Sequence, residues 1–272
     1  MGDKGRWMGC MASKNLFVKN SYLYVALITS ISGCAQDYSF APLPTGEKTT
    51  ITIKVPEELE AKPMRVMYRS AICRRITYNG NGKPRSLEGF KGFEMDFKRR
   101  GKDLLKGELF INGGGKCEWR LSNVVFSVRY RAQNRFGNAT PGIDAGIIVV
   151  FDHNDPQIRS SGSVTSEPRD LVVVKDYYPW VNEGFIDGYV KTADLAGEEG
   201  IYLTYVARQA RSVFFEPVLH SSYVVSSKEP AKQKLGEFIT FYYPDGTIQS
   251  DGRHVPDFEK LQVIRRGVEG RK

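Results

Sequence analysis

Residues 116–133, KCEWRLSNVVFSVRYRAQ, form the longest stretch rich in β-branched and aromatic residues in this sequence. Its apolar residues recur with a period of two, first at Cys117, Trp119 and Leu121 and then at Val124, Phe126, Val128 and Tyr130. This spacing is typical of a β-strand with a buried face. The alternation changes parity near Ser122 and Asn123, which predicts a β-bulge or a bend within one long strand.

Similar stretches occur on both sides of this strand, separated by short clusters of turn-forming residues. The clearest are TTITIKV at 49–55, MRVMYRSAICRRITY at 64–78, GFKGFEMDFKRR at 89–100, GIIVVF at 146–151 and DLVVVKDYYPWV at 170–181. Asn-Gly pairs at 79–82 and an Asp-Gly pair at 245–246 tolerate positive φ and predict hairpin turns. Since helical periodicity is almost absent, the sequence predicts an all-β fold of the antiparallel sandwich type. Only VPDFEKLQVIRR at 255–266 fits either a final strand or a short helix.

The stretch RFGNATPGIDAG at 135–146 is rich in Gly, Pro and Asn, a composition typical of connections between compact units. We therefore expect two β-rich domains in tandem, at 49–135 and 145–272. The segment 34–48 that precedes them is polar and contains two prolines, which predicts a flexible tether.

The segment Ser21–Gly33 contains thirteen uncharged residues and follows Lys14 and Lys19. This run is shorter than the ~20 residues that an apolar helix needs to span a bilayer. A basic region, an apolar region and a small-residue end together have the layout of a secretory signal, which we place at 1–33. The sequence therefore predicts an exported protein.

The end of this segment, Ile31-Ser32-Gly33-Cys34, resembles the lipobox of bacterial lipoproteins. The resemblance implies that Cys34 is acylated and becomes the first residue of a mature chain held in the periplasm by a lipid. Ala35 is not the aspartate associated with inner-membrane retention in enteric lipoproteins. By the same resemblance, the anchor is expected in the outer membrane.

The formal net charge of the full chain is +8 and falls to +5 without residues 1–33, which carry four Lys or Arg and one Asp. The remaining basic residues are scattered in short clusters such as Arg74-Arg75 and Arg265-Arg266. Such a distribution fits a solvated surface better than a concentrated basic patch with stacking aromatics. We therefore expect no nucleic-acid partner.

Four cysteines are present, and Cys10 and Cys34 belong to the signal and the lipobox. Cys73 and Cys117 remain as an even pair, which favours a disulfide in an oxidising compartment. Neither has a His or Cys neighbour at the short spacing of a metal site. We predict a Cys73–Cys117 disulfide and no bound metal.

Sites for catalysis are not evident in the sequence. It contains no G-x-S-x-G elbow, and its histidines, at 153, 220 and 254, lie far apart. Asp152, Asn154 and Asp155 offer oxygen ligands, but they fit an Asx turn better than a calcium loop. We assign no catalytic residue and no cofactor, and we expect the protein not to be an enzyme.

The densest aromatic cluster consists of Tyr177, Tyr178 and Trp180. Such side chains are ordinary core residues when packed inside, and they anchor protein interfaces when they are exposed. We expect some of them in the core and at least one at the surface that binds a partner.

Two landmarks carry a family resemblance: KPMRVMYRSAIC at 62–73 and GGGKCEWRLSN at 113–123. Together with the lipobox they resemble periplasmic lipoproteins that are encoded beside type VI secretion phospholipase effectors and act as their immunity proteins. The resemblance implies a non-catalytic protein that binds and neutralises a cognate toxin in the periplasm. It transfers no effector-contacting residue to this chain.

Two other functions remain open: a structural or assembly lipoprotein of the envelope, and a carbohydrate- or lipid-binding module. A large toxin-like reading frame beside the gene would favour immunity. An envelope defect on deletion alone would favour assembly, and a planar row of exposed aromatics would favour sugar binding.

Overall fold

The computed structural model describes residues 36–131, 134–156, 163–165, 169–185, 188–198, 202–232, 234 and 236–270. The predicted signal and Cys34 lie outside these residues. Residues 37–272 form one compact unit. Its strands are β1 Lys48–Lys54, β2 Leu59–Ala61, β3 Met64–Tyr78, β4 Pro84–Met95, β5 Lys98–Arg99, β6 Leu104–Phe110, β7 Asn112–Gly114, β8 Trp119–Tyr130, β9 Thr140–Pro141, β10 Ala145–Val150, β11 Ser163–Thr165, β12 Asp170–Gly184, β13 Val190–Gly197, β14 Tyr202–Val206, β15 Ser212–Leu219, β16 Val225–Lys228, β17 Thr240–Tyr242 and β18 Ile248–Gln249. The helical elements are the 3-10 turn η1 Asn134–Phe136 and the helix α1 Phe258–Glu269.

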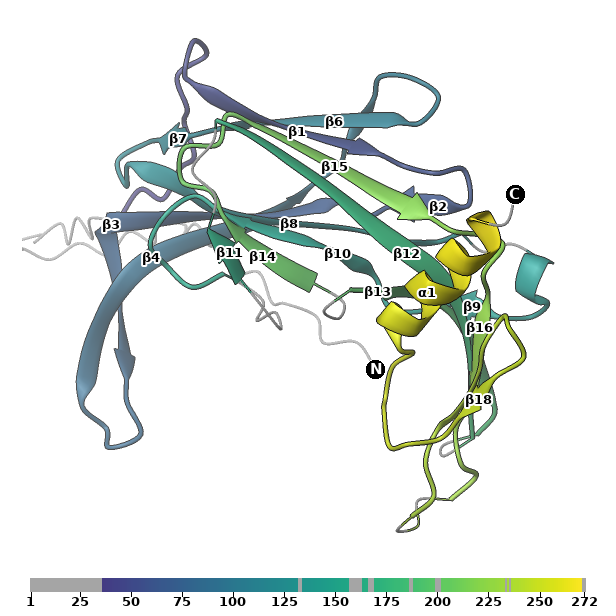
Figure 1. The fold of residues 1–272 in the computed structure, drawn as a ribbon. Helices are drawn as coiled ribbons and strands as arrows, with labels where there is room; N and C mark the ends of the chain where they lie inside the picture. The colour runs from purple at the N-terminus through teal and green to yellow at the C-terminus, as the bar shows by residue number, and fades with distance from the viewer. Residues whose placement is uncertain are drawn as a thin grey trace, which may run out of the picture. The chain divides into compact units, whose positions relative to one another are not determined.

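Two mixed β-sheets form the body of the protein (Figure 1). One sheet has the strand order β18-β17-β16-β12-β15-β1-β6-β5, with β13 paired to β12 and β9 to β13. The other has the order β11-β14-β10-β8-β3-β4, with β2 and β7 paired to β8. The predicted all-β sandwich is confirmed. The sheets are mixed and not purely antiparallel, because β1, β12 and β16 pair in parallel with neighbours from distant parts of the chain.

The main core lies between the two sheets. In β1 the alternation of TTITIKV turns Thr49, Ile51 and Ile53 inward, and all three are fully buried. Phe126 of β8 meets Phe215 of β15 across the sandwich, with ring centroids 6.0 Å apart. Burial of large aromatic and β-branched side chains from both layers stabilises the packing of one sheet on the other.

The parity switch predicted in the longest strand is present. Met67 of β3 pairs with Asn123, whereas the next residue, Tyr68, pairs with Leu121. Ser122 is thus the extra residue of a β-bulge, which places apolar residues on opposite parities before and after it. The prediction of a strand buried on both faces at 146–151 is also confirmed, since every residue of β10 is buried.

The predicted division into two tandem domains is wrong. β1 and β8, from the first predicted domain, pair with β15 and β10, from the second. The Gly- and Pro-rich stretch at 135–146 leads from β8 to its direct neighbour β10 in one sheet. Its composition therefore reflects a connection between adjacent strands and not a linker between domains.

The predicted flexible tether at 34–48 is also wrong for its described part. Phe40 packs against Tyr68 and Phe93, with ring centroids 4.8 Å and 5.8 Å away. The backbone N–H of Ala41 donates to the carbonyl oxygen of Gly113 at 2.9 Å. Because the partly buried ring of Phe40 packs on the main core, the segment is fixed despite its polar composition.

The segment 255–266 forms the larger part of the helix α1, which continues to Glu269 and covers a second, smaller core. Asp257 caps the helix by accepting a hydrogen bond from the N–H of Lys260. Leu261 packs on Tyr178 of β12 and Phe241 of β17 in this core. Within the described residues, no helix is long and apolar enough to cross a membrane.

Candidate functional site

The hairpin of β3 and β4 extends beyond the sandwich and is the candidate interaction surface (Figure 1). β3 pairs with β8 only through Arg65–Arg69, whereas its pairing with β4 continues to Tyr78. Residues 72–90, here called the hairpin arm, therefore form a two-stranded ribbon whose outer part has no third strand among the described residues. Such a ribbon is a marginal structure unless something holds it.

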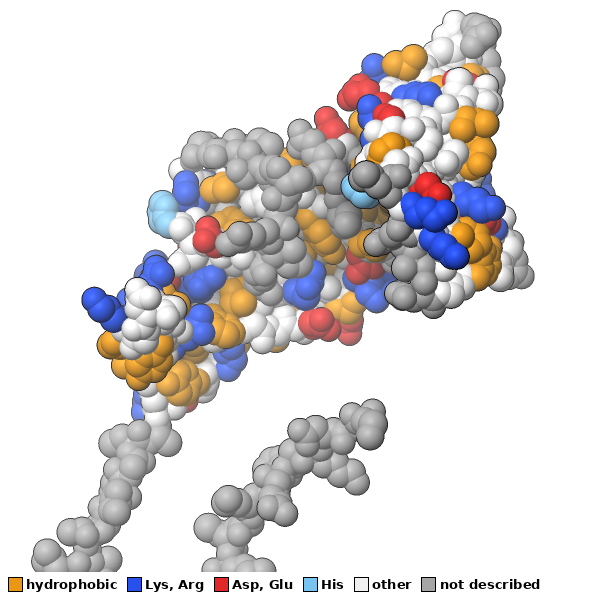
Figure 2. Space-filling view, turned by 90° about the horizontal axis from the view of Figure 1, so that it is seen from below, with side chains coloured by type: hydrophobic (Ala, Val, Ile, Leu, Met, Phe, Trp, Pro, Cys, Tyr) orange, Lys and Arg blue, Asp and Glu red, His pale blue; other side chains and the backbone are white. Residues whose placement is uncertain are grey.

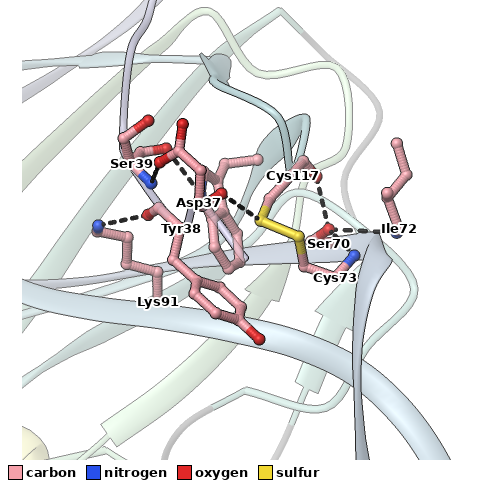
Figure 3. The surroundings of a disulfide bond; sticks show 9 residues. Asp37, Tyr38, Ser39, Ser70, Ile72, Cys73, Lys91 and Cys117 are labelled. Carbon is pink, nitrogen blue, oxygen red and sulfur yellow. Dashed lines mark hydrogen bonds between the residues drawn. A yellow bond between two sulfur atoms is a disulfide. The ribbon is translucent and has the colours of Figure 1, made fainter. Parts of the chain in front are cut away.

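The base of the hairpin arm is held by the predicted disulfide, which is confirmed (Figure 3). Cys73 and Cys117 are bonded, with their Cα atoms 5.2 Å apart. The hydroxyl of Ser70 donates to the carbonyl oxygen of Cys117 at 2.5 Å and accepts the N–H of Cys73 at 2.8 Å. The bond therefore joins β3 to the turn that precedes β8.

The register of the two arm strands shifts at this point. Ser70 pairs with Gly89 and Arg75 pairs with Leu87, so β3 advances by five residues while β4 advances by two. A Cβ atom on Gly89 would lie 1.9 Å from the carbonyl oxygen of Cys73, so only glycine fits opposite the bulged residues. Such an irregularity redirects the strand beyond it.

Large apolar side chains are exposed along the hairpin arm. Ile76 and Tyr78 are each 69% exposed, and Ile72 is more than half exposed. Since Ile76 and Tyr78 are two residues apart in one strand, they project from the same face of the ribbon. An exposed aromatic and an aliphatic side chain on one face are the kind of residues that protein interfaces bury.

Basic side chains accompany them, as the mixture of orange and blue on the arm in Figure 2 shows. Arg74 donates from Nε to the hydroxyl of Ser86 at 2.8 Å and from Nη2 to its carbonyl oxygen at 3.1 Å. The guanidinium of Arg75 lies 4.7 Å from the ring centroid of Phe90, a cation–π contact. The arm carries four Lys or Arg and one Glu, so its surface is positively charged.

The tip of the hairpin arm is an ordered turn, as predicted from its Asn-Gly pairs. The side-chain oxygen of Asn79 accepts the N–H groups of Asn81 and Lys83 at 3.0 Å and 2.9 Å. Gly82 has a φ of 70°, which glycine adopts without strain. The arm is thus defined at both its base and its tip.

The predicted aromatic anchors lie elsewhere, and two of them are not at the surface. Tyr177 is 4% exposed and Tyr178 is fully buried, so these two are core residues, as expected for some of the cluster, and they are removed from the candidate partner contacts. Both belong to β12, and burial raises the pKa of each phenol. Trp180 is half-buried, and its indole N–H donates to the hydroxyl of Ser227 at 2.7 Å, so it alone remains a candidate contact.

The exposed residues of the hairpin arm were missed by sequence reasoning. The alternation of β3 places Val66, Tyr68 and Ile72 on one parity, but only the first two are buried. The register shift after Ser70 breaks this pattern. The shift lies at Cys73, which is bonded to the distant Cys117. The available signal was the continuation of strand-like residues past Cys73, up to an Asn-Gly turn.

The other candidate groups have structural roles. The carboxylate of Asp152 accepts the N–H of Asn154 at 2.9 Å, as in an Asx turn. His220 lies 2.7 Å from Asp176 through its Nε2. Among the described residues, no three His, Cys, Asp or Glu side chains form a group that could hold a metal ion. No family model, no curated protein and no solved structure matches this chain.

Proposed function

We propose that this protein is an exported lipoprotein, anchored in the outer membrane through Cys34, that binds and neutralises a toxin in the periplasm. A type VI secretion phospholipase effector is the toxin class that the sequence resemblance favours. The observation that carries the proposal is the hairpin arm, an exposed, basic and apolar ribbon that is fixed by a disulfide. Inhibition takes place by direct binding, without catalysis.

The disulfide supports the proposed compartment. Such bonds persist in the bacterial periplasm and are rare in the cytosol of mesophiles. The bond between Cys73 and Cys117 therefore agrees with the secretory signal and the lipobox.

The geometry of the hairpin arm supports binding. An element that is rigid before it meets its partner loses little conformational freedom on association. Tyr and Arg are enriched at the centre of protein interfaces, exposed apolar patches mark interaction sites, and positive charge speeds encounter with an acidic surface. The hairpin arm combines these features: Ile76 is an exposed apolar residue, Tyr78 an exposed aromatic and Arg75 a positive charge.

The direct test is to delete the gene and challenge the strain with toxin-delivering siblings, then to mix the purified protein with the toxin encoded beside it. We expect the deletion strain to be killed and the two proteins to form a complex. Survival equal to that of the parent, together with no complex, would contradict the proposal and favour a structural lipoprotein. Labelling with a clickable fatty acid tests the anchor at Cys34 separately.

Paired substitutions test the contact surface. Ile76→Ala combined with Tyr78→Ala removes the exposed side chains of the arm and should weaken the complex by about 30-fold or more, as loss of a hot spot does. Ile248→Ala combined with Tyr189→Ala is a matched control, because these residues are also more than half exposed but lie outside the arm. Equal affinities for the two double variants would show that the toxin binds another face.

A further inference from the structure

The segment Asp37–Ala41 is clamped against three consecutive glycines of the body. A Cβ atom on Gly114 would lie 2.2 Å from the carbonyl oxygen of Ala41, and one on Gly115 would lie 2.3 Å from that of Ser39. A Cβ atom on Gly113 would meet the ring of Phe40 at 2.3 Å. The segment thus fits a channel that stays open only because Gly113, Gly114 and Gly115 have no Cβ atom.

Side chains complete the clamp (Figure 3). The indole N–H of Trp119 donates to the carbonyl oxygen of Ser39 at 3.2 Å, and Nζ of Lys91 donates to that of Tyr38 at 3.0 Å. The carboxylate of Asp37 accepts the N–H of Ser39 at 2.9 Å. This bond, with smaller contributions from the charges of Lys116 and Lys91, holds the pKa of Asp37 below its usual range. The chain is therefore fixed from Asp37 onward.

The connection between Cys34 and this clamped segment is very short. Only Ala35 and Gln36 lie between Cys34 and Asp37, and three extended residues span at most about 11 Å whatever their path. The step rests on the lipid anchor of the proposed function. With the lipid in the bilayer, the part of the body around Asp37 cannot move farther from the membrane surface than the length of this connection.

The surface around this point suits a lipid interface. Tyr38 is about half exposed, and amphipathic tyrosines are common at the level of lipid headgroups. Lys91 lies within hydrogen-bond distance of the carbonyl oxygen of Tyr38, and the charges of Lys91 and Lys116 act on the carboxylate of Asp37. Basic side chains beside a lipid anchor strengthen attachment to anionic headgroups.

We propose that this anchor-side face, formed by Tyr38, Lys91 and Lys116, lies on an anionic phospholipid bilayer. The body then lies in contact with the membrane and does not move freely at the end of a flexible linker. The hairpin arm, whose base adjoins the same face at Cys73, is held near the lipid surface. That is where a lipid-degrading toxin has to arrive to reach its substrate.

Lysine footprinting on vesicles tests the seating. In the chain 34–272 Cys34 is the only cysteine outside the disulfide, so its thiol can be coupled to a maleimide lipid in phosphatidylglycerol–phosphatidylethanolamine vesicles. If the face is seated about nine-tenths of the time, acetylation of Lys91 and Lys116 should slow about tenfold relative to the free protein. Lys98 and Lys102, exposed near β5 on the other sheet, are internal controls and should keep their rates.

Acetylation of Lys91 and Lys116 at the same rate on vesicles as in the free protein would overturn the proposal. So would protection of Lys91 and Lys116 that appears only after the toxin is added, because the face would then be a protein interface. A ~20-residue Gly-Ser insertion between Gln36 and Asp37 allows a separation of roughly 25 Å and should restore the free rates. The maleimide lipid replaces acylation of Cys34, and the test needs no toxin. The membrane contact can therefore be disproved while toxin binding is observed, and toxin binding can be disproved while the membrane contact is observed.

Discussion

Single residues determine how the hairpin arm and the clamp are held. Gly89 and Gly114 admit backbone approaches that any Cβ atom would block. The Cys73–Cys117 bond then fixes the bulged residues of β3 to the turn before β8. The positions that define the candidate site are thus small residues and cysteines, while the side chains that would meet a partner lie farther out on the ribbon.

Replacing both cysteines by serine should lower the free energy of unfolding by about 2–5 kcal/mol, because the bond closes a long loop. Urea unfolding of the variant and of the wild type, with and without reductant, measures the effect. Reduced wild type should match the variant, and unchanged stability in both would contradict the prediction.

Gly114→Ala should release the clamped segment. Gly114 has a φ of 61°, and the added methyl group would also collide with Ala41, so we expect a loss of about 1–3 kcal/mol. Hydrogen exchange at residues 37–41 should speed up. Gly80→Ala is the matched control, because nothing lies within 4 Å of its Cβ position; equal exchange in the two variants would show that the channel is not needed.

At the scale of elements, α1 is joined to the sheet by a partly buried polar network. The amide of Gln262 donates to Asp176 at 2.8 Å, and Nε of Arg265 donates to the hydroxyl of Tyr178 at 3.0 Å. Burial raises the pKa of Asp176, but hydrogen bonds from Gln262 and His220, with the charges of His220 and Arg265, outweigh it and leave the pKa lowered. The ionised carboxylate therefore stabilises the docked helix.

Asp176→Asn should lower the free energy of unfolding at pH 7 by about 1–2 kcal/mol, the usual effect of losing hydrogen bonds to a charged group. The sign follows from the lowered pKa: the contribution is present above the unfolded value, near 3.9, and is lost as the pH falls through the folded value. The difference between wild type and variant in urea unfolding should therefore shrink as the pH falls below the unfolded value. A difference that stays constant from pH 7 to pH 3 would contradict this origin.

Elements were predicted from the sequence where their patterns are local. The alternation of β1, the buried run of β10 and the bulge at Ser122 depend on neighbouring residues, and each was predicted. The sequence of α1 fits either a strand or a helix, because Val263 is apolar yet exposed. The residues that α1 packs against, Tyr178 and Phe241, lie in other elements of the chain. The exposure of Ile76 and Tyr78 does not follow from local alternation, since it depends on the register shift between Ser70 and Arg75.

At the scale of the whole molecule, the strand order joins the two halves of the chain. β1 lies between β6 and β15, so one of its two partner strands comes from beyond residue 200. Local patterns identify strands but do not state which strands pair. A Gly-rich connection between neighbours was therefore mistaken for a domain boundary.

Neither half should fold alone. Fragments 37–135 and 136–270 each lose strand partners and expose core residues such as Ile51 and Phe215, whereas the intact chain should unfold in one cooperative transition. Amide dispersion in NMR spectra of the separate and mixed fragments measures this. A well-dispersed spectrum from either fragment alone would contradict the prediction.

The pairing of β1 with β15 also has a consequence for the time course of folding. Residues 162 positions apart, such as Lys54 and Glu216, meet in the finished sheet, and such non-local contacts form slowly. At 5–20 residues per second, roughly 8–30 s separate the synthesis of the two strands. During that interval one edge of β1, with Ile51 and Ile53, has no partner and can pair with other chains. The yield of native protein should therefore depend on how well the emerging chain is shielded until its last third has been made.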